Sequence, residues 1–458
     1  MRLIASLFYS NVQNWDDTII ALATPAGVGA LAVLRISGPS AFSLVQRLLP
    51  FQDLGKKKSH SAFLGKLAWA GQPLDEALVT KFSGPRSFTG EDVIELSLHG
   101  SPYVVQEVLK ACLANGCRLA AAGEFTKRAF LNRKLDLSQA EAVGDLIMAE
   151  SEAAHRTALH QLKGGLSREI QHLRQQLIDF AALVELELDF GEEDVEFADR
   201  ARLRALIQEI NQHINKLLQS FSTGQAIKNG IPIVIVGPPN AGKSTLLNAL
   251  LEEEKAIVSP IAGTTRDVIE DTVVLEGIQF RFVDTAGLRQ TEDEVEKIGI
   301  ARTKTRLEQA SFALLLQGPD SVEDEVVEIE KEIVRMGIPF LKVLTKNDLY
   351  SPDAEGFSLS AATGAGLSAL KQALVEKTVN QNMLRSENTL ITNIRHFEAL
   401  QKTQQALEQT DLALGREVSG DLLATDIREA LFHLGSITGE ITVEDVLGSI
   451  FSRFCIGK

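Results

Sequence analysis

Cysteines, long apolar runs and basic residues are all scarce in this sequence of 458 residues. The cysteines, Cys112, Cys117 and Cys455, are too few for a disulfide framework or a cysteine-rich metal cluster. We expect them to be small buried apolar groups in a reducing compartment. No apolar run approaches the roughly 18–20 residues that a membrane-spanning helix needs, so the composition excludes a helical membrane protein.

Lysine and arginine number 46 against 61 aspartates and glutamates, which gives a net charge of −15. This balance excludes a broad basic surface for nucleic acid, so any RNA site has to be a local patch. Residues 1–9 are apolar, but Arg2 is their one basic residue and Asp16 and Asp17 close the stretch. We interpret the start of the chain as an N-terminal extension of a cytoplasmic protein, since a signal peptide has another pattern.

A glycine-rich loop at residues 237–244 is the strongest motif. Its sequence, GPPNAGKS, fits the phosphate-binding pattern G-x-x-x-x-G-K-[ST] and follows the apolar run Ile231–Val236. That run predicts a buried parallel strand, and residues 245–251 predict a helix whose N-terminus faces the phosphates. Lys243 is placed to contact the β- and γ-phosphates and Ser244 to bind Mg²⁺. The loop therefore predicts a nucleoside triphosphate site.

Further motifs follow in the order typical of GTPases. Gly263–Asp267 contains Thr265 as a second Mg²⁺ ligand, and the predicted strand Phe280–Val283 ends in the sequence DTAG at residues 284–287. Predicted strands at 312–316 and 340–344 lead to the sequence TKND at 345–348, and residues 357–359 lead to SAA at 360–362. The Asp348 carboxylate can accept from N1–H and N2–H₂ of guanine, donors that adenine lacks as a pair.

Two residues depart from the commonest GTPase pattern. Thr345 stands where many GTPases have asparagine, which predicts altered guanine affinity without loss of binding. Leu288 follows DTAG where Ras-like proteins have a water-orienting glutamine, and leucine cannot orient water. We therefore expect another polar group and another charge to assist hydrolysis.

The segments outside the nucleotide region predict an α+β domain and a helical bundle. Strands are expected at 18–23, 30–36, 62–69, 77–82 and 93–98, with two helices at 41–49 and 102–115, the second capped by Gly116. Apolar residues from Leu159 to Val184 predict one continuous helical stripe, and a further helix is expected at 203–221. After residue 384, two more stripes lack a partner in their own segment: Ile391, Ile394, Phe397 and Leu400, then Leu423, Ile427, Leu431 and Leu434.

These stripes predict a bundle built from two separate segments, with the GTPase domain inserted between them. The predicted domains are 1–132 (α+β), 133–227 (first helical part), 228–384 (Ras-like P-loop GTPase) and 385–458 (second helical part). For the last helix we expect Thr442 as N-cap with Asp445 reaching back to it. Its predicted apolar stripe is Val443, Val446, Leu447, Ile450, Phe451 and Phe454.

From residue 17 to residue 458 the sequence resembles the MnmE (TrmE) family of tRNA-modification GTPases. The strings that carry the resemblance are AVLRISGP (32–39), SFTGEDVIELSLHG (87–100), GEFTKRAFLNRKLDL (123–137), GPPNAGKST (237–245), AGTTRD (262–267), DTAGLR (284–289), EVEKIG (294–299) and FCIGK (454–458). The resemblance implies a homodimer and an N-terminal domain that binds 5-formyl- or methylene-tetrahydrofolate through Arg35, Glu95, Lys134 and Lys458.

The resemblance also implies how hydrolysis is assisted. Potassium is bound by Asn240, Ser259, Ile261 and Thr264, and the G domains dimerise across their nucleotides. Glu296 matches the catalytic carboxylate, although the residues alone favour a plain charge in an acidic loop. Lys243 joins it as a catalytic residue. The GTP-binding residues are then Asn240, Ala241, Gly242, Lys243, Ser244, Thr245, Ser259, Pro260, Ile261, Ala262, Gly263, Thr264, Thr265, Asp284, Thr285, Ala286, Gly287, Thr345, Lys346, Asp348, Ser360, Ala361 and Ala362.

For Cys455 two interpretations stay open: a nucleophilic or redox-active thiol near the folate, or a packed apolar residue. For the whole chain the resemblance implies a GTPase that depends on Mg²⁺ and K⁺. With an FAD-dependent MnmG-type partner, in a heterotetramer, it adds a carboxymethylaminomethyl or aminomethyl group to C5 of the wobble uridine of certain tRNAs. The alternatives are a regulatory GTPase that binds ribosomal RNA, disfavoured by the acidic balance, and a folate-binding scaffold whose GTPase gates a partner.

Overall fold

The computed structural model describes residues 17–189, 200–255, 271–283, 304–305, 307–349, 357–378, 389–415, 420–441 and 444–457. Contacts divide the chain into two compact units. The first consists of Met1–Gly144, Gln161–Ile178 and Leu431–Lys458, and the second of Asp145–His160 and Asp179–Ala430. The predicted domain boundaries at 132, 227 and 384 stay predictions. None of the helices in the described ranges combines the length and apolarity of a membrane span.

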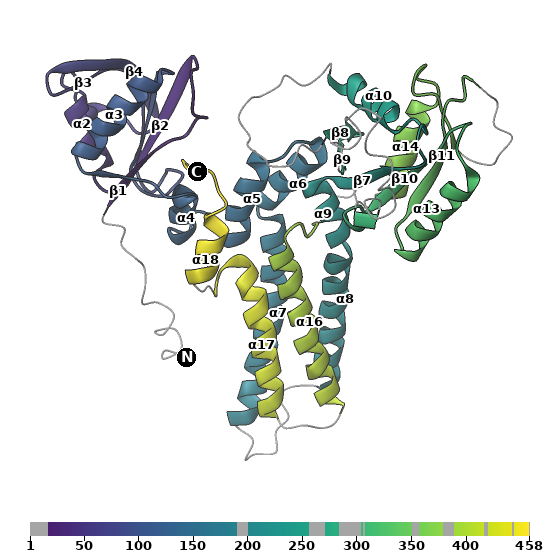
Figure 1. Cartoon of the computed structure of the whole chain (residues 1–458). Coiled ribbons are helices and arrows are strands. Elements are labelled where there is room, and N and C mark those ends of the chain that lie inside the picture. The colour runs from purple at the N-terminus through teal and green to yellow at the C-terminus, as the bar shows by residue number, and fades with distance from the viewer. Residues whose placement is uncertain are drawn as a thin grey trace. The chain divides into compact units, whose positions relative to one another are not determined.

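The first unit contains a six-stranded sheet with strand order β3-β4-β5-β2-β1-β6 (Figure 1). Its strands are β1 (Thr18–Leu22), β2 (Leu31–Ser37), β3 (Ser61–Trp69), β4 (Gln72–Phe82), β5 (Val93–His99) and β6 (Cys117–Leu119). The helices α2 (Ala41–Leu48) and α3 (Pro102–Ala114) pack their buried leucines and valines on one face. Alternate strand residues fill this core, while Ile19 and Ala21 of β1 lie in a second cluster with Ala120 and Phe125.

The five predicted strands and both predicted helices of this domain are confirmed to within a few residues, apart from an earlier start of β4. The sequence analysis missed β6 and the helix α4 (Glu124–Leu131), while α5 (Leu137–Ile147) lies in the segment 133–227 that was predicted to be helical. Strand β6 has three residues, too few for an alternating pattern to appear. The expectation of two helices in the α+β domain was therefore wrong. Gly116, with φ of 102°, follows the cap residue Asn115, so it terminates α3 as expected.

The stripe expected from Leu159 to Val184 is wrong in its continuity, because the chain forms two helices there, but its members from Leu166 to Val184 are buried as predicted. Helix α6 (Glu152–Leu162) is followed by α7 (Gly165–Asp189), and Gly164 between them has a φ of 78°. A left-handed residue at this point ends one helix and lets the next begin at a new angle. The helix expected at 203–221 is also two helices, α8 (Arg200–Gln219) and α9 (Phe221–Asn229).

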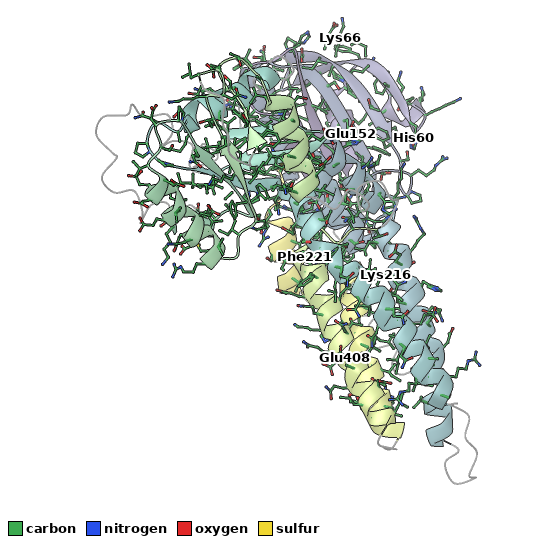
Figure 2. The ribbon with its side chains drawn as sticks, turned by 90° about the vertical axis from the view of Figure 1, so that its right-hand side faces the viewer. His60, Lys66, Glu152, Lys216, Phe221 and Glu408 are labelled. Atoms are coloured by element: carbon green, nitrogen blue, oxygen red, sulfur yellow. The ribbon has the colours of Figure 1, made fainter. Side chains whose placement is uncertain are left out.

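The C-terminal helices are α16 (Ile394–Leu414), α17 (Gly420–Thr438) and α18 (Glu444–Phe451). Within the second unit α16 lies along α8: Arg204 pairs with Asp411 at 2.8 Å, and Gln404 donates to Asn215 at 2.8 Å (Figure 1). The Phe221 ring, labelled in Figure 2 at the start of α9, stacks on Phe397 of α16 with centroids 4.3 Å apart. These contacts are of the kind that a bundle of two chain segments requires.

The predicted stripe Ile391, Ile394, Phe397 and Leu400 is wrong at Ile394, whereas Ile391 and Leu400 are buried and Phe397 is half-buried. Ile391 precedes α16, and Ile394 is 53% exposed. The buried face of α16 consists of His396, Ala399, Leu400, Thr403, Ala406, Leu407, Thr410 and Leu414. The hydroxyls of the two buried threonines donate to carbonyl oxygens of the preceding helical turn. Because threonine counts as polar in a sequence pattern, the buried face of α16 could not be recognised from its apolar residues. The stripe predicted for α17 is confirmed, with Leu431 half-buried and its other members buried.

The second unit contains another six-stranded sheet, in the order β12-β11-β10-β7-β9-β8. Its strands are β7 (Ile231–Val236), β8 (Asp271–Leu275), β9 (Ile278–Phe282), β10 (Phe312–Gln317), β11 (Phe340–Leu344) and β12 (Phe357–Ser358). Strand β8, which the sequence analysis missed, pairs antiparallel with β9, and the other pairs are parallel. Such a sheet needs helices on both faces.

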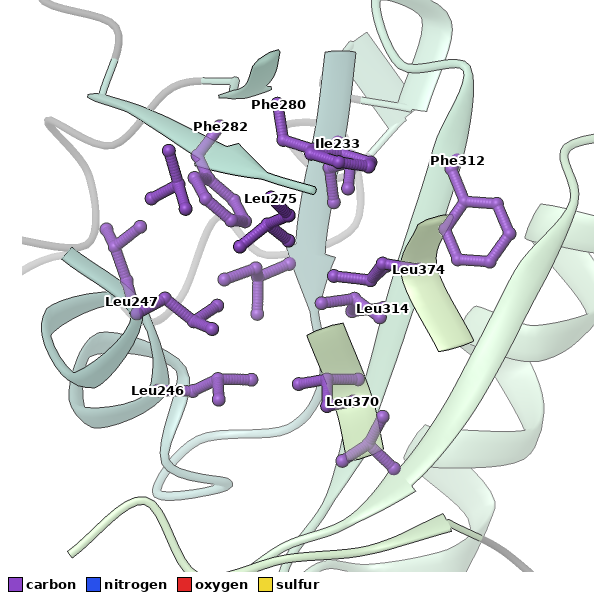
Figure 3. Close-up of a cluster of buried hydrophobic side chains, with 14 of the residues drawn as sticks. Ile233, Leu246, Leu247, Leu275, Phe280, Phe282, Phe312, Leu314, Leu370 and Leu374 are labelled. Atoms are coloured by element: carbon purple, nitrogen blue, oxygen red, sulfur yellow. The ribbon is translucent and has the colours of Figure 1, made fainter. Parts of the chain in front are cut away.

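The isoleucines of β7 point into one core with α10 (Lys243–Lys255) and α14 (Leu367–Thr378), shown in Figure 3. The valines of β7 point into the other, with α13 (Glu323–Arg335). The predicted phosphate loop therefore follows a central strand of a sheet that is covered by helices on both faces.

Candidate functional sites

The phosphate loop has a backbone that requires its glycines. Gly237 has a φ of 155°, and a Cβ added there would lie 2.5 Å from the carbonyl oxygen of Leu316 on β10. Gly242 has a φ of 86°, and Asn240, exposed between them, has a φ of 59°. Left-handed residues in such a loop turn successive N–H groups inward, which is how phosphate is bound. The predicted strand, loop and helix are confirmed as elements.

Lys243 begins α10, and its ammonium lies within the loop. Nζ donates to the carbonyl oxygens of Gly237 at 2.9 Å and Pro238 at 2.7 Å. Ser244 is half-buried and Thr245 exposed in the first turn of the same helix. The cation thus stands at the loop that the sequence predicts for phosphates, while the roles of Lys243, Ser244 and Thr245 stay predictions.

A second loop leaves β11 and contacts the first. The Thr345 hydroxyl donates to the carbonyl oxygen of Ala241 at 2.8 Å, and Thr345 is 3% exposed. Lys346 is left-handed, with a φ of 61°. The Asn347 amide donates to Ser358 Oγ at 3.1 Å, which ties this loop to β12, and Asp348 is exposed. The structure therefore brings the predicted phosphate and base loops together through Thr345.

The third loop follows β12. Ser360 is fully buried, and its hydroxyl accepts from the N–H of Thr363 at 3.3 Å. Ala361 packs against the sheet core, and Ala362 is exposed. Several predicted residues lie outside the described part of the chain: Ser259, Pro260, Ile261, Ala262, Gly263, Thr264, Thr265, Asp284, Thr285, Ala286, Gly287, Leu288, Glu296, Thr442, Val443 and Lys458. Within the described ranges, no cluster of three His, Cys, Asp or Glu residues could hold a metal ion.

In the first unit, the structure places Arg35 and Glu95 side by side. They are cross-strand neighbours on β2 and β5, joined at 2.8 Å. The Arg35 guanidinium also donates to the carbonyl oxygen of Gly457 at 3.3 Å and lies 5.7 Å from the ring centroid of Phe88 and 5.8 Å from that of Phe125. The sequence analysis did not single out either phenylalanine as a partner of Arg35. A signal was available for both, since Phe88 lies in the string 87–100 and Phe125 in the string 123–137 that carry the family resemblance.

Lys134 reaches the same segment of chain that carries Phe88. Its ammonium donates to the carbonyl oxygen of Pro85 at 3.0 Å. A Cβ on Gly90, whose φ is 81°, would lie 3.4 Å from the Lys134 side chain. The structure thus brings Arg35 and Lys134 to residues 85–90, and Glu95 to Arg35. Their role in binding folate stays a prediction.

Cys455 is exposed, so its interpretation as a packed residue is wrong, as is the expectation that all three thiols are buried. Its neighbour Ile456 forms a β-bridge with Ala122, and the Gly123 N–H donates to the Cys455 carbonyl at 3.5 Å. Buried Cys112 and Cys117 fit the expectation; a hydrogen bond with Cys117 and burial raise the pKa of the Cys112 thiol. In α18, Leu447 and Phe451 are buried, but Val446 is 39% exposed, so the predicted stripe is wrong at Val446.

The first unit also contains a network of buried ion pairs that sequence reasoning missed. Arg128 on α4 is fully buried and contacts Asp17 at 2.7 Å, Glu91 at 3.1 Å and Glu124 at 3.0 Å. Burial alone raises the pKa of the Glu124 carboxyl, but hydrogen bonds from Arg118 and the Ala121 N–H and the charge of Arg128 together lower it below its ordinary value. Because Glu91 also accepts from Ser37 at 2.6 Å, the network fixes the loop after Phe88 to β2.

The fold and the loops define a P-loop nucleotide-binding protein with an appended α+β domain and helices. A model described as "MnmE helical domain" matches residues 137–455, and one described as "GTP-binding protein TrmE N-terminus" matches residues 18–134.

Relatives named tRNA modification GTPase MnmE match nearly the full chain. The Cytophaga hutchinsonii protein is 50% identical, covering 98% of this chain and 99% of its own length. Those of Christiangramia forsetii and Flavobacterium johnsoniae are 48% and 49% identical, each covering 97% of this chain and 99% of its own. The chain belongs to the MnmE (TrmE) family.

Proposed function

We propose that this chain is a GTP-hydrolysing tRNA modification enzyme. It adds a carboxymethylaminomethyl or aminomethyl group to C5 of the wobble uridine, position 34, of certain tRNAs. The observation that carries the proposal is 50% identity over 98% of the chain to a relative named tRNA modification GTPase. An FAD-dependent MnmG-type partner supplies the redox chemistry, in a heterotetramer with a homodimer of this chain. The GTPase domain is inserted between the two parts of the helical domain. GTP hydrolysis drives the opening and closing of the GTPase domains.

The phosphate loop is suited to the hydrolytic step. When GTP binds, Lys243 exchanges the carbonyl oxygens of Gly237 and Pro238 for β- and γ-phosphate oxygens, because an anion is the stronger partner for an ammonium. Ser244 and Thr265 would hold Mg²⁺, which neutralises charge on those phosphates when bound. The base is selected by Asp348, an exposed acceptor for the guanine donors.

Potassium takes the place of an arginine finger in this proposal, with Asn240, Ser259, Ile261 and Thr264 as ligands and Glu296 positioning water. Asn240 supports it by its exposed place on the outer side of the phosphate loop, in a left-handed conformation. Hydrolysis should be much faster in K⁺ than in Na⁺ at equal ionic strength. Asn240→Ala should remove most of the difference, and equal wild-type rates in both salts would exclude the potassium site.

Folate binding is proposed for the surface formed by Arg35, Glu95 and Lys134, with Lys458 from the tail. The donor set fits a tetrahydrofolate, whose glutamate carboxylates suit the cations and whose pterin donors suit a carboxylate. The Lys134 ammonium donates to a neutral acceptor, the carbonyl oxygen of Pro85, so its positive charge stays available to an anion. Bound folate would supply the one-carbon unit.

Mass spectrometry of wobble nucleosides in bulk tRNA, with and without the gene, tests the function. Loss of the C5-modified uridines in the deletion strain, restored by the wild-type gene, is the expected result. A variant with Lys243→Ala should fail to restore them while the protein accumulates normally. Unchanged nucleosides, together with co-sedimentation of the protein with ribosomal subunits, would favour the ribosome-assembly alternative.

A further inference from the structure

The Thr345 hydroxyl faces the protein. Oγ1 lies 2.8 Å from the carbonyl oxygen of Ala241 and 3.4 Å from that of Gln317. The side chain also packs against the phosphate loop and the end of β10, since Cβ atoms added to Gly242 and Gly318 would lie 3.8 and 3.5 Å from Oγ1. With 3% exposure, this side chain serves as a tether between the base loop and the phosphate loop.

The single hydroxyl proton of Thr345 limits the hydrogen bonds that this side chain can donate to a nucleotide. A hydroxyl has one proton to donate, and carbonyl oxygens only accept. Because both neighbours of Oγ1 are carbonyl oxygens, that proton is committed to the protein. An asparagine amide has two N–H donors, so it can keep the tether and still donate to a ligand. Asn347 is attached to another element, β12, because its amide donates to Ser358 Oγ at 3.1 Å.

Guanine has acceptors as well as donors. Its N1–H and N2–H₂ donors suit Asp348, whereas N7, on the imidazole ring that bears the ribose, can only accept. Thr345 is the base-loop residue that touches the phosphate loop, so it stands on the ribose and phosphate side of any base held by Asp348. It is therefore the loop residue best placed for N7, and it has no proton to give.

We propose that this chain binds guanine nucleotides without a hydrogen bond to N7 of the base, so that Asp348 selects guanine by its donors alone. The proposal rests on the proposed GTPase function. It predicts tolerance of guanine nucleotides altered at N7, and it makes position 345 a determinant of how the base is recognised.

The test compares GDP with 7-deaza-GDP, in which N7 is replaced by a C–H group. Both displace a ribose-labelled fluorescent GDP from the full-length protein, which gives the two dissociation constants without any turnover. Wild type should bind the two nucleotides within about twofold of each other. Thr345→Asn should prefer GDP by about fivefold, the worth of one neutral hydrogen bond.

Two controls separate recognition from folding. Thr345→Ser keeps the hydroxyl and should behave like wild type. Thr345→Val loses the tether and should weaken both nucleotides equally, with an unchanged ratio. A fivefold or larger loss for 7-deaza-GDP in wild type would overturn the proposal, and so would equal binding of both nucleotides by Thr345→Asn. Failure of wild type to bind GDP at all would instead refute the GTPase function.

Discussion

At the scale of single residues, hydrogen bonds from buried side chains to the backbone determine features of the nucleotide site that the sequence motifs do not reveal. Thr345 stands where the common GTPase pattern has asparagine, and in the structure its hydroxyl donates to the carbonyl oxygen of Ala241 in the phosphate loop. The motif predicted the right residue at the right place, because loop motifs fix local geometry. It could not predict the partner Ala241, since a contact between residues 104 positions apart depends on the assembled sheet.

Arg128 gives the first prediction. Its guanidinium is fully buried among three carboxylates, so Arg128→Met leaves buried charges without compensation and should cost the N-terminal domain about 3–5 kcal/mol. Both tryptophans of the chain, Trp15 and Trp69, precede residue 70, so urea unfolding followed by tryptophan fluorescence reports on this domain.

Lys66→Met is the matched control, because the Lys66–Glu76 pair joins β3 and β4 of the same domain with both side chains exposed (Lys66 is labelled in Figure 2). An exposed pair is worth about 0–1 kcal/mol, so the unfolding midpoint of this variant should hardly move. Similar midpoints for the two variants would contradict the importance of the buried network.

The same network predicts a pH dependence. Folding lowers the pKa values of Asp17 and Glu124 from ordinary values of 3.8 and 4.5. Carboxyls with a lowered folded-state pKa stabilise the domain above their unfolded pKa, and this stability is lost as pH falls through the folded value. The urea midpoint read by tryptophan should therefore begin to drop below about pH 4.5. Glu124→Gln should start from a lower midpoint at pH 7 and show a shallower decline.

At the scale of elements, the parallel strands and the buried stripe of α17 were predictable, whereas the buried face of α16 was not. Strands such as β7 and β10 are buried on both faces and read as unbroken apolar runs. The face of α16, in contrast, includes buried Thr403 and Thr410, which bond their own helix. A count of hydrophobic residues passes over such threonines, so the predicted stripe omitted both of them and included the exposed Ile394.

The β8–β9 hairpin makes contacts that no local pattern predicts. Its turn accepts a hydrogen bond from the Ala153 N–H at the start of α6, through the Gly277 carbonyl at 3.1 Å. The buried Gln279 amide donates to Glu150 at 2.5 Å. All four residues belong to the second unit. The hairpin is thereby attached to the chain segment that precedes the GTPase sheet.

Removing the Glu150 carboxylate should loosen this attachment. Glu150→Ala leaves the buried Gln279 amide without an acceptor, which costs about 1–3 kcal/mol locally. Hydrogen–deuterium exchange should accordingly become faster in residues 271–283. Glu376→Ala is the control, because it removes the acceptor of Gln372 in an exposed pair and should change nothing there. Unaltered exchange in Glu150→Ala would contradict the proposed attachment.

At the scale of the whole molecule, the C-terminus returns to the N-terminal domain within one compact unit. Phe451 and Phe454 anchor it: a Cβ on Gly123 would lie 2.6 Å from the Phe451 carbonyl oxygen, and one on Gly144 would lie 3.2 Å from the Phe454 ring. The last residues then extend past Ala122 to Arg35. The apolar pattern predicted an anchored tail and the family resemblance grouped Lys458 with Arg35, whereas the hydrogen bond from Arg35 to the Gly457 carbonyl, across 422 positions, comes from the structure.

Deleting residues 455–458 tests what this return is for. The deletion spares the anchors Phe451 and Phe454 but removes the Gly457 carbonyl from Arg35 and the Ile456 bridge to Ala122. We expect calorimetric titration with 5-formyltetrahydrofolate to show no binding, and tRNA modification to be lost. GTP hydrolysis stimulated by potassium should persist, because the predicted hydrolytic residues lie between Gly237 and Ala362 in the other unit.

A point variant separates the chemistry of the tail from its placement. Cys455→Ala removes an exposed thiol and leaves Gly457 and its contact with Arg35, so folate affinity should stay at the wild-type value. If this variant binds folate but no longer modifies tRNA, the thiol takes part in the reaction. If it modifies tRNA normally, Cys455 is dispensable and the tail acts by position alone. Wild-type folate affinity in the deletion protein would show instead that the tail does not contribute to the folate site, and that Arg35, Glu95 and Lys134 suffice.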